Sequence, residues 1–224
     1  LLNYSMKLII WLIYIFSILF LSSCKDKDQL IIDDSSTDYY TTYKDYTLDS
    51  LSGNIIDSEI TIDDFQSAQE CKDCHLQHYE EWETSFHAHA FTDKVFLNMW
   101  ESEKESRPIT GSNYCVQCHA PAAFVSGYDL DGIDNPEDLS LPSIIREGVS
   151  CDICHTMVDK SPSVHTQDHV AAVAKYHLNP GENIKYGSIQ SPDTNSFHQS
   201  GYLPLFNLSS SCMPCHNQSI RGMP

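Results

Sequence analysis

The sequence predicts a mainly α-helical fold with long loops and one small β-hairpin. Its clearest feature is the pentapeptide Cys-x-x-Cys-His, which occurs four times, at 71–75, 115–119, 151–155 and 212–216. Apolar and aromatic residues recur at helical spacing beside these pentapeptides, which favours short helices around them. Two short runs of β-forming residues flank a turn sequence at 179–183, which favours a hairpin.

The pentapeptide is the attachment signal for haem c. Its two cysteines form thioether bonds to the vinyl groups of one haem, and the histidine that follows binds the iron. Zinc is the alternative for Cys-x-x-Cys pairs, but zinc does not require a histidine after every second cysteine. We therefore predict four covalently bound haem c groups. Their attachment residues are Cys71, Cys74, Cys115, Cys118, Cys151, Cys154, Cys212 and Cys215, and their proximal ligands are His75, His119, His155 and His216.

Residues 65–224 are predicted to form this tetrahaem domain. Only about 40 residues are available for each haem, so we expect the haems themselves to form much of the apolar core. Helices are expected at 67–85, 92–105 and 142–147, and the two hairpin strands at 170–178 and 184–189. In the second helix the residues expected to face the core are Val95, Phe96, Met99 and Trp100.

The N-terminal residues 1–23 are predicted to be a signal peptide. An apolar run follows Lys7 and ends at Leu21-Ser22-Ser23-Cys24, which resembles a bacterial lipobox. In such a signal Cys24 becomes the lipid-attachment residue. An uncleaved anchor helix is the alternative, although the run is short for a membrane span. Both interpretations predict an extracytoplasmic protein held at a membrane, with the lipoprotein facing the periplasm or the cell surface.

Residues 24–64 are predicted to be an acidic, flexible tether, because they are rich in Asp, Ser, Thr and Tyr and have no sustained periodicity. The whole chain has a formal net charge of −18. So acidic a surface argues against nucleic acid as a partner and favours basic redox proteins. Apart from Cys24, every cysteine belongs to a pentapeptide, so no disulfide framework is predicted.

The first pentapeptide continues with Tyr79, Trp82 and the segment Ser85-Phe86-His87-Ala88. This pattern resembles the opening of the cytochrome c-554 / c-552/4 family of multihaem cytochromes. Three later segments also match the family, at 147–150, 185–187 and 196–198. The resemblance covers about residues 67 to 220, and it implies an electron-transfer module with haems in close pairs and mostly two histidines on each iron. Family members usually continue beyond the position of Pro224, so a truncated C-terminus is expected.

The resemblance also implies that His87 and His198 are distal ligands, each reaching the iron of a haem attached elsewhere in the chain. The chain has 11 histidines, so seven remain beside the four proximal ones. His165 and His169 are spaced i, i+4, and one of them is a third candidate. His78, His89 and His177 are expected to be packing or surface residues.

We favour an extracytoplasmic, membrane-tethered tetrahaem c-type cytochrome that transfers electrons between redox partners. The alternative is a multihaem oxidoreductase in which one five-coordinate haem acts on a small nitrogen or sulfur oxyanion species. The difference lies in the axial ligands, because an iron with two strong ligands has no open position for a substrate. An electron carrier is favoured over a catalyst, and no catalytic side chain is predicted. A third hypothesis, a zinc or thiol module without haem, would require a colourless protein.

Overall fold

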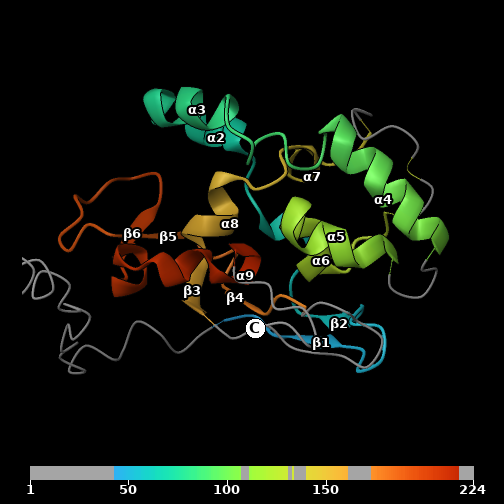
Figure 1. The fold of residues 1–224 in the computed structure, drawn as a ribbon. Coiled ribbons are helices and arrows are strands. Elements are labelled where there is room, and N and C mark those ends of the chain that lie inside the picture. The colour runs from blue at the N-terminus through green and yellow to red at the C-terminus, as the bar shows by residue number, and fades with distance from the viewer. Residues whose placement is uncertain (1–42, 107–110, 131–132, 134–139, 161–172, 217–224) are drawn as a thin grey trace, which may run out of the picture. The chain divides into compact units, whose positions relative to one another are not determined.

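The structure is a computed structural model that describes residues 43–106, 111–130, 133, 140–160 and 173–216. These residues form short helices, small strand pairs and long connections (Figure 1), which confirms the predicted fold class. The signal peptide, Cys24, His165 and His169 fall outside the described residues. Within the described ranges, no helix is both long enough and apolar enough to cross a bilayer.

The helix expected at 67–85 is divided in two, α2 (Ala68–Lys72) and α3 (Leu76–Glu83). Ser67 caps α2, and its hydroxyl oxygen accepts a hydrogen bond from Gln69 N at 3.2 Å. The break lies inside the first pentapeptide, where His75 has a non-helical backbone and precedes α3. The predicted extent of the helical region was therefore right, but the prediction of one continuous helix was wrong.

Helix α4 (Lys94–Ser106) corresponds to the second expected helix. Phe96 and Trp100 are buried as predicted, but Val95 and Met99 are 66% and 64% exposed. Successive residues of a helix point about 100° apart. Turning Phe96 and Trp100 toward the core therefore directs Val95 and Met99 away from it, and half of the predicted apolar face was wrong.

The other pentapeptides also lie on short helices. The second ends α5 (Gly111–His119), the third forms α8 (Cys151–His155), and the fourth lies where a 3₁₀ turn runs into α9 (Met213–His216). The helix expected at 142–147 is confirmed as α7 (Ser143–Arg146). The remaining helical elements are α6 (Pro121–Ser126), η2 (Ile62–Asp64), η3 (Pro204–Asn207) and η4 (Ser209–Cys212).

The strands pair differently from the predicted hairpin. Both runs around 179–183 contain a strand, β4 (Tyr176–Leu178) and β5 (Ile184–Gly187), but the two do not pair with each other. Strand β4 is antiparallel to β3 (Met157–Lys160), and β5 is parallel to β6 (Gln199–Tyr202). The reason is burial: β4 places Tyr176 and Leu178 in the main core, whereas β5 places Tyr186 in a second, smaller cluster.

Part of the predicted tether is folded. Strands β1 (Tyr46–Leu48) and β2 (Ile55–Ser58) form an antiparallel pair, and Ile60 is almost fully buried. Ser58 Oγ donates a hydrogen bond to Val125 O at 2.7 Å, which attaches this pair to α6. Residues 43–64 are therefore folded and are not a flexible tether, while the division of the chain into domains stays a prediction. Residues 24–42 lie outside the described ranges.

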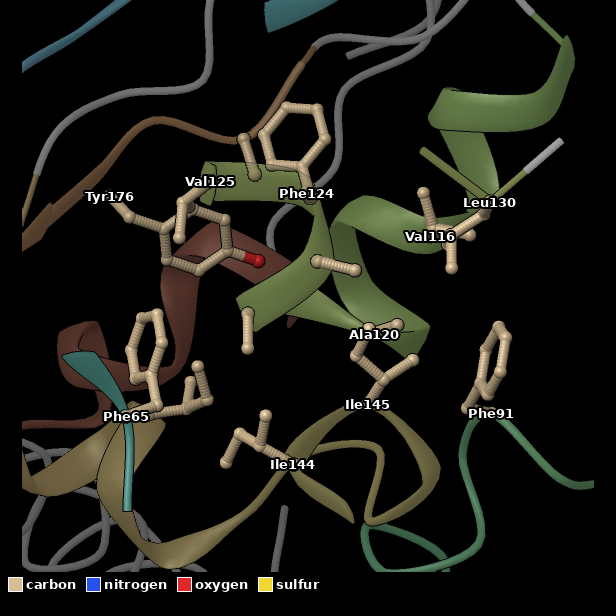
Figure 2. Packing of buried hydrophobic residues seen from close by; sticks show 14 of the residues in the cluster. Phe65, Phe91, Val116, Ala120, Phe124, Val125, Leu130, Ile144, Ile145 and Tyr176 are labelled. Carbon is tan, nitrogen blue, oxygen red and sulfur yellow. The ribbon is translucent and has the colours of Figure 1, made fainter. Parts of the chain in front are cut away.

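Figure 2 shows the main core, which includes Val116 of α5, Ala120 at the start of α6, Phe124 of α6 and Ile145 of α7. Tyr176 of β4 packs against the same group, with its ring 6.5 Å from that of Phe124. The chain thus has an apolar core of its own between the pentapeptides. That haems supply much of the remaining core stays a prediction.

Candidate functional site

The first and third pentapeptides lie side by side. The thiol groups of Cys71 and Cys151 share a hydrogen bond, which lowers the pKa of Cys71 and raises the pKa of Cys151. Gln66 N donates to Asp152 Oδ2 at 2.9 Å, and Ala68 N donates to a Glu147 carboxylate oxygen at the same distance. Two carboxylates from around the third pentapeptide therefore bind the backbone that leads into α2.

Trp82 adds a side-chain link between the same two regions. Its Nε1 donates to Val149 O at 2.8 Å, two residues before Cys151. The ring of Trp82 also lies beside that of Tyr79, with 5.6 Å between ring centroids. The indole hydrogen bond fixes α3 against the approach to the third pentapeptide.

The second and fourth pentapeptides form a comparable pair. The thiols of Cys118 and Cys215 share a hydrogen bond, which raises the pKa of Cys118 and lowers the pKa of Cys215 to about 7. Between them lies Tyr176, whose hydroxyl donates to Gln117 O and lies 3.1 Å from Cys215 Sγ. Burial raises the pKa of Tyr176 well above its usual value, so the phenol keeps its proton.

Two of the proximal histidines have the orientation that an iron ligand needs. His119 Nδ1 lies 2.6 Å from Ala90 O, and His155 Nδ1 lies 2.6 Å from Tyr186 O. With a carbonyl as partner, Nδ1 carries the proton and donates it. The other ring nitrogen, Nε2, is then left unprotonated and available to a metal.

Two histidine pairs join distant parts of the chain. The ring centroids of His87 and His216 are 6.1 Å apart, and those of His75 and His198 are 6.3 Å apart. A metal–imidazole bond is about 2 Å long, so two rings on opposite sides of one metal have centroids about 6 Å apart. The angle between the rings, 65° and 28° in the two pairs, is free to vary about the axis through the metal.

His78 also lies near His75, with 6.2 Å between ring centroids. It stands one helical turn further along α3 and approaches Glu81 at 3.8 Å. Since His75 and His78 belong to the same short helical segment, we expect them to lie on the same side of a haem attached at Cys71 and Cys74. His198 comes from the segment before β6, so it is the better candidate for the opposite side.

The segment that carries His87 is bound to the approach of the third pentapeptide. Val149 N donates to His87 O at 3.0 Å, and Gly148 next to it has a positive φ of 63°. One residue further on, Ser150 Oγ is buried without a hydrogen-bond partner among the described residues. An orphan hydroxyl at the start of a Cys-x-x-Cys-His helix is a site for a polar group brought by a ligand.

These observations fit haem c. The eight pentapeptide cysteines and four proximal histidines all lie in the described residues, and two of the histidines present Nε2 as an iron ligand requires. The structure places His87 and His198 each beside a proximal histidine, while His165 and His169 lie outside the described residues. Their assignments as ligands remain predictions.

Several residues that join the pentapeptides were not predicted to do so from the sequence. They are Tyr176, Trp82, Gly148, Asp152 and Lys185, whose Nζ donates a hydrogen bond to Asp152 Oδ1. Asp152 occupies a variable position of the Cys-x-x-Cys-His pattern, so nothing in the pattern distinguished it. Lys185 lies in a segment that resembles the family, and this resemblance was its only signal. Asp152 and Lys185 join the pentapeptides through contacts between distant segments, and the sequence does not reveal such contacts.

Comparisons with known proteins agree with haem c as the cofactor. Residues 70–156 match the model of the family described as cytochrome c554 and c-prime. Among solved structures, the fold is similar to that of a penta-haem cytochrome c552 from Thermochromatium tepidum, with a TM-score of 0.50 and 20% sequence identity. That match covers 71% of this chain, and this chain spans only 47% of the other protein. A search of curated proteins found no match.

The family match begins just before Cys71 and ends just after His155, so it includes the first three pentapeptides and His87. The similar fold extends over a larger part of the chain. Over residues 70–156 the chain is thus similar in sequence to the cytochrome c554 and c-prime family, and over a larger part it is similar in fold to a multihaem cytochrome c.

Proposed function

We propose that this protein is an extracytoplasmic, membrane-tethered tetrahaem cytochrome c that transfers electrons between redox partner proteins. The observation that carries the proposal is the pairing of His75 with His198 and of His87 with His216 at about 6 Å, the spacing of two imidazoles on one iron. Each pair combines a proximal histidine with a candidate distal one from a remote segment. An iron held in this way has no open position for a substrate.

Haem c, when bound, supplies a one-electron iron couple whose potential the protein adjusts through axial ligands, burial and hydrogen bonds. The chain's own residues hold the haems and orient their ligands. The cysteines fix the attachment points, and Ala90 O and Tyr186 O orient His119 and His155. The contacts between Cys71 and Cys151, and between Cys118 and Cys215, bring the attachment points of separate haems together, which favours electron transfer between them.

The number of haems is tested by covalent stoichiometry. Four complete pentapeptides support four haem c groups, although the similar solved protein is named as a penta-haem cytochrome and is the longer of the two. We expect a protein matured by a c-type haem attachment system to gain the mass of four haems. Replacing both cysteines of one pentapeptide with serine should remove the mass of one.

The location and partner are further parts of the proposal. The lipobox at 21–24 supports a lipid anchor at Cys24, and the net charge of −18 supports a basic redox partner. We expect Cys24→Ala to move the protein from the membrane fraction to the extracytoplasmic soluble fraction. Electron transfer to a basic partner should slow as ionic strength rises, because salt screens the attraction.

A carbon monoxide difference spectrum of the dithionite-reduced protein separates the candidate functions, because carbon monoxide binds ferrous haem only where an axial position is open. We expect no change in the Soret band. A shift from one of the haems would overturn the carrier proposal in favour of an oxidoreductase acting on a small nitrogen or sulfur oxyanion species. A colourless protein after maturation would instead support a zinc or thiol module.

A further inference from the structure

A buried ion pair joins the regions of the first and third pentapeptides. Lys185 Nζ donates to Asp152 Oδ1, and the side chains are 15% and 1% exposed. The second carboxylate oxygen, Oδ2, accepts a hydrogen bond from Gln66 N at 2.9 Å. Among the ion pairs of the described residues, this one has the most deeply buried carboxylate.

Both charges lie beside the groups that hold one haem. Asp152 stands between Cys151 and Cys154, the attachment residues of the third pentapeptide. Lys185 precedes Tyr186, whose carbonyl oxygen orients the proximal ligand His155. The pair therefore borders both the covalent attachment and the axial ligand of the same haem.

The same charges act on the first pentapeptide. The hydrogen bond with Cys151 is the main cause that lowers the pKa of Cys71, and burial acts against it. The charge of Asp152 also raises this pKa, whereas the charge of Lys185 lowers it. Cys71 Sγ is an attachment atom of the first haem. The field of the pair therefore reaches an atom that is covalently bound to a second haem.

Such a pair is a costly way to stabilise a fold. Moving two charges out of water costs several kcal/mol, and well-packed apolar residues often serve stability as well or better. The charges have a direct effect on a redox centre, however. A nearby carboxylate favours the more positive ferric form and a nearby ammonium favours the ferrous form, most strongly where water does not screen them.

We propose that Asp152 and Lys185 each shift the reduction potential of the haem attached at Cys151 and Cys154, and more weakly that of the haem at Cys71, in opposite directions. The carboxylate lowers the potential, the ammonium raises it, and the pair holds the two effects in balance. The step concerned would be the transfer of one electron to the haem iron from a reduced partner protein, or from the electrode in a titration, and neither residue gains or loses a proton in it. This inference rests on the proposed function, since it requires haem at these pentapeptides.

The experiment is a spectroelectrochemical titration of four variants beside the unaltered protein. Asp152→Asn removes the negative charge with little change in shape, and Lys185→Met removes the positive charge. The double variant removes both, and Lys185→Arg keeps the charge. Asp152→Asn is measured at pH 6 and Lys185→Met at pH 8, with the unaltered protein at both, so that the remaining amine or carboxyl keeps its ordinary charge. Mass spectrometry first establishes the haem number of each variant.

We expect Asp152→Asn to raise the midpoint of one or two haem components by about 59 mV, which is a tenfold change in the equilibrium constant for one-electron reduction. Lys185→Met should lower the same components by a similar amount. The double variant and Lys185→Arg should lie close to the unaltered protein. A merely structural role would shift the potentials in one direction for both single variants, and that result would overturn the inference.

Glu101→Gln is the matched control, because Glu101 is 64% exposed in its ion pair with Lys104 and its charge is screened by water. It should leave all components unmoved. If Asp152→Asn does not fold, Lys185→Met and Lys185→Arg are compared instead. A lower reduction potential in Lys185→Met alone supports the inference, and equal shifts in the two variants overturn it. A fully loaded protein with unmoved potentials overturns this inference only, whereas absence of haem from the unaltered protein overturns the proposed function.

Discussion

A β-carbon placed on Gly148 would lie 2.6 Å from the carbonyl oxygen of His87, so these two residues approach each other through backbone alone. The contact is maintained by the neighbouring hydrogen bond from Val149 N to His87 O. Gly148 also has φ of +63°, a conformation that other residues adopt at a cost. The position of a candidate iron ligand thus depends on a glycine 61 residues further along the chain.

Gly148→Ala should destabilise the protein and displace His87. The strained φ and the collision with His87 O together should lower the free energy of unfolding by about 1–3 kcal/mol. The reduced variant should gain carbon monoxide binding at one haem. Gly187→Ala is the control, since a β-carbon there meets no atom within 4 Å. Equal behaviour of the two variants would contradict the proposed contact.

Removing either candidate distal ligand should open one iron. We expect His87→Ala and His198→Ala each to bind carbon monoxide at one haem and to raise that haem's potential, because imidazole stabilises ferric iron. The difference spectrum and a redox titration measure both effects. His89→Ala, which alters an exposed residue of the segment that carries His87, should change neither.

His78→Ala tests the assignment at the first pentapeptide separately. Its ring is as near to His75 as that of His198, and only its place on α3 argues against ligation. The variant should keep a closed iron. Carbon monoxide binding by His78→Ala, with none by His198→Ala, would exchange the two assignments.

Tyr176→Phe should weaken the junction between the second and fourth pentapeptides. The change leaves the buried carbonyl oxygen of Gln117 without its donor and removes the hydroxyl beside Cys215 Sγ. An unsatisfied buried acceptor costs about 1–3 kcal/mol, to be measured by denaturant unfolding of the haem-loaded protein. Tyr202→Phe removes a half-exposed hydroxyl that accepts only a 3.3 Å bond from Asn207, and it should have little effect.

The N-terminal segment should contribute stability that depends on pH. Partial burial raises the pKa of Asp64, but hydrogen bonds from Lys44 and Thr61 outweigh it and lower the pKa overall. A lowered pKa stabilises the folded state above the ordinary value of about 4, and this gain is lost as pH falls through the folded value. Asp64→Asn should therefore be less stable than the unaltered protein at pH 7, and the difference should vanish in acid.

Asp63→Asn is the neighbouring control for this measurement, because Asp63 is exposed. At pH 7 it should be closer in stability to the unaltered protein than Asp64→Asn is. A flexible tether up to residue 64 would make both variants behave alike, so the comparison also tests where the folded domain begins. Thermal unfolding of both variants and of the unaltered protein at several pH values measures this difference in stability.

The sequence predicted the chemistry of the site because a haem-attachment signal is local. Two residues between cysteines and a histidine directly after them can be recognised without any knowledge of the fold. The strand partners of Tyr176 and Ile184 could not be read in this way. Local turn residues favoured a hairpin, whereas burial of Tyr176 against Phe124 and Cys215 decided the pairing.

The same limit explains why the folded residues 43–64 were predicted to be part of a tether. Residues 43–64 are polar enough to resemble a tether, and their few apolar residues show no period. What holds them are contacts with distant segments, such as the hydrogen bond from Tyr176 N to Tyr46 Oη at 2.7 Å. Similarly, the periodicity of α4 did not reveal which of its apolar residues are buried, because that depends on contacts such as those of Trp100 with Phe91 and of Phe96 with His119.

The contacts between pentapeptides alternate along the chain, the first with the third and the second with the fourth. Each pair therefore has one member of the other pair between its own two members in the sequence. A cut at any point from residue 76 to residue 211 separates the members of at least one pair, so the protein has no self-contained half. Gene fragments encoding one or two pentapeptides should yield incomplete folds, and a shortened or duplicated relative would have to keep or copy the whole set.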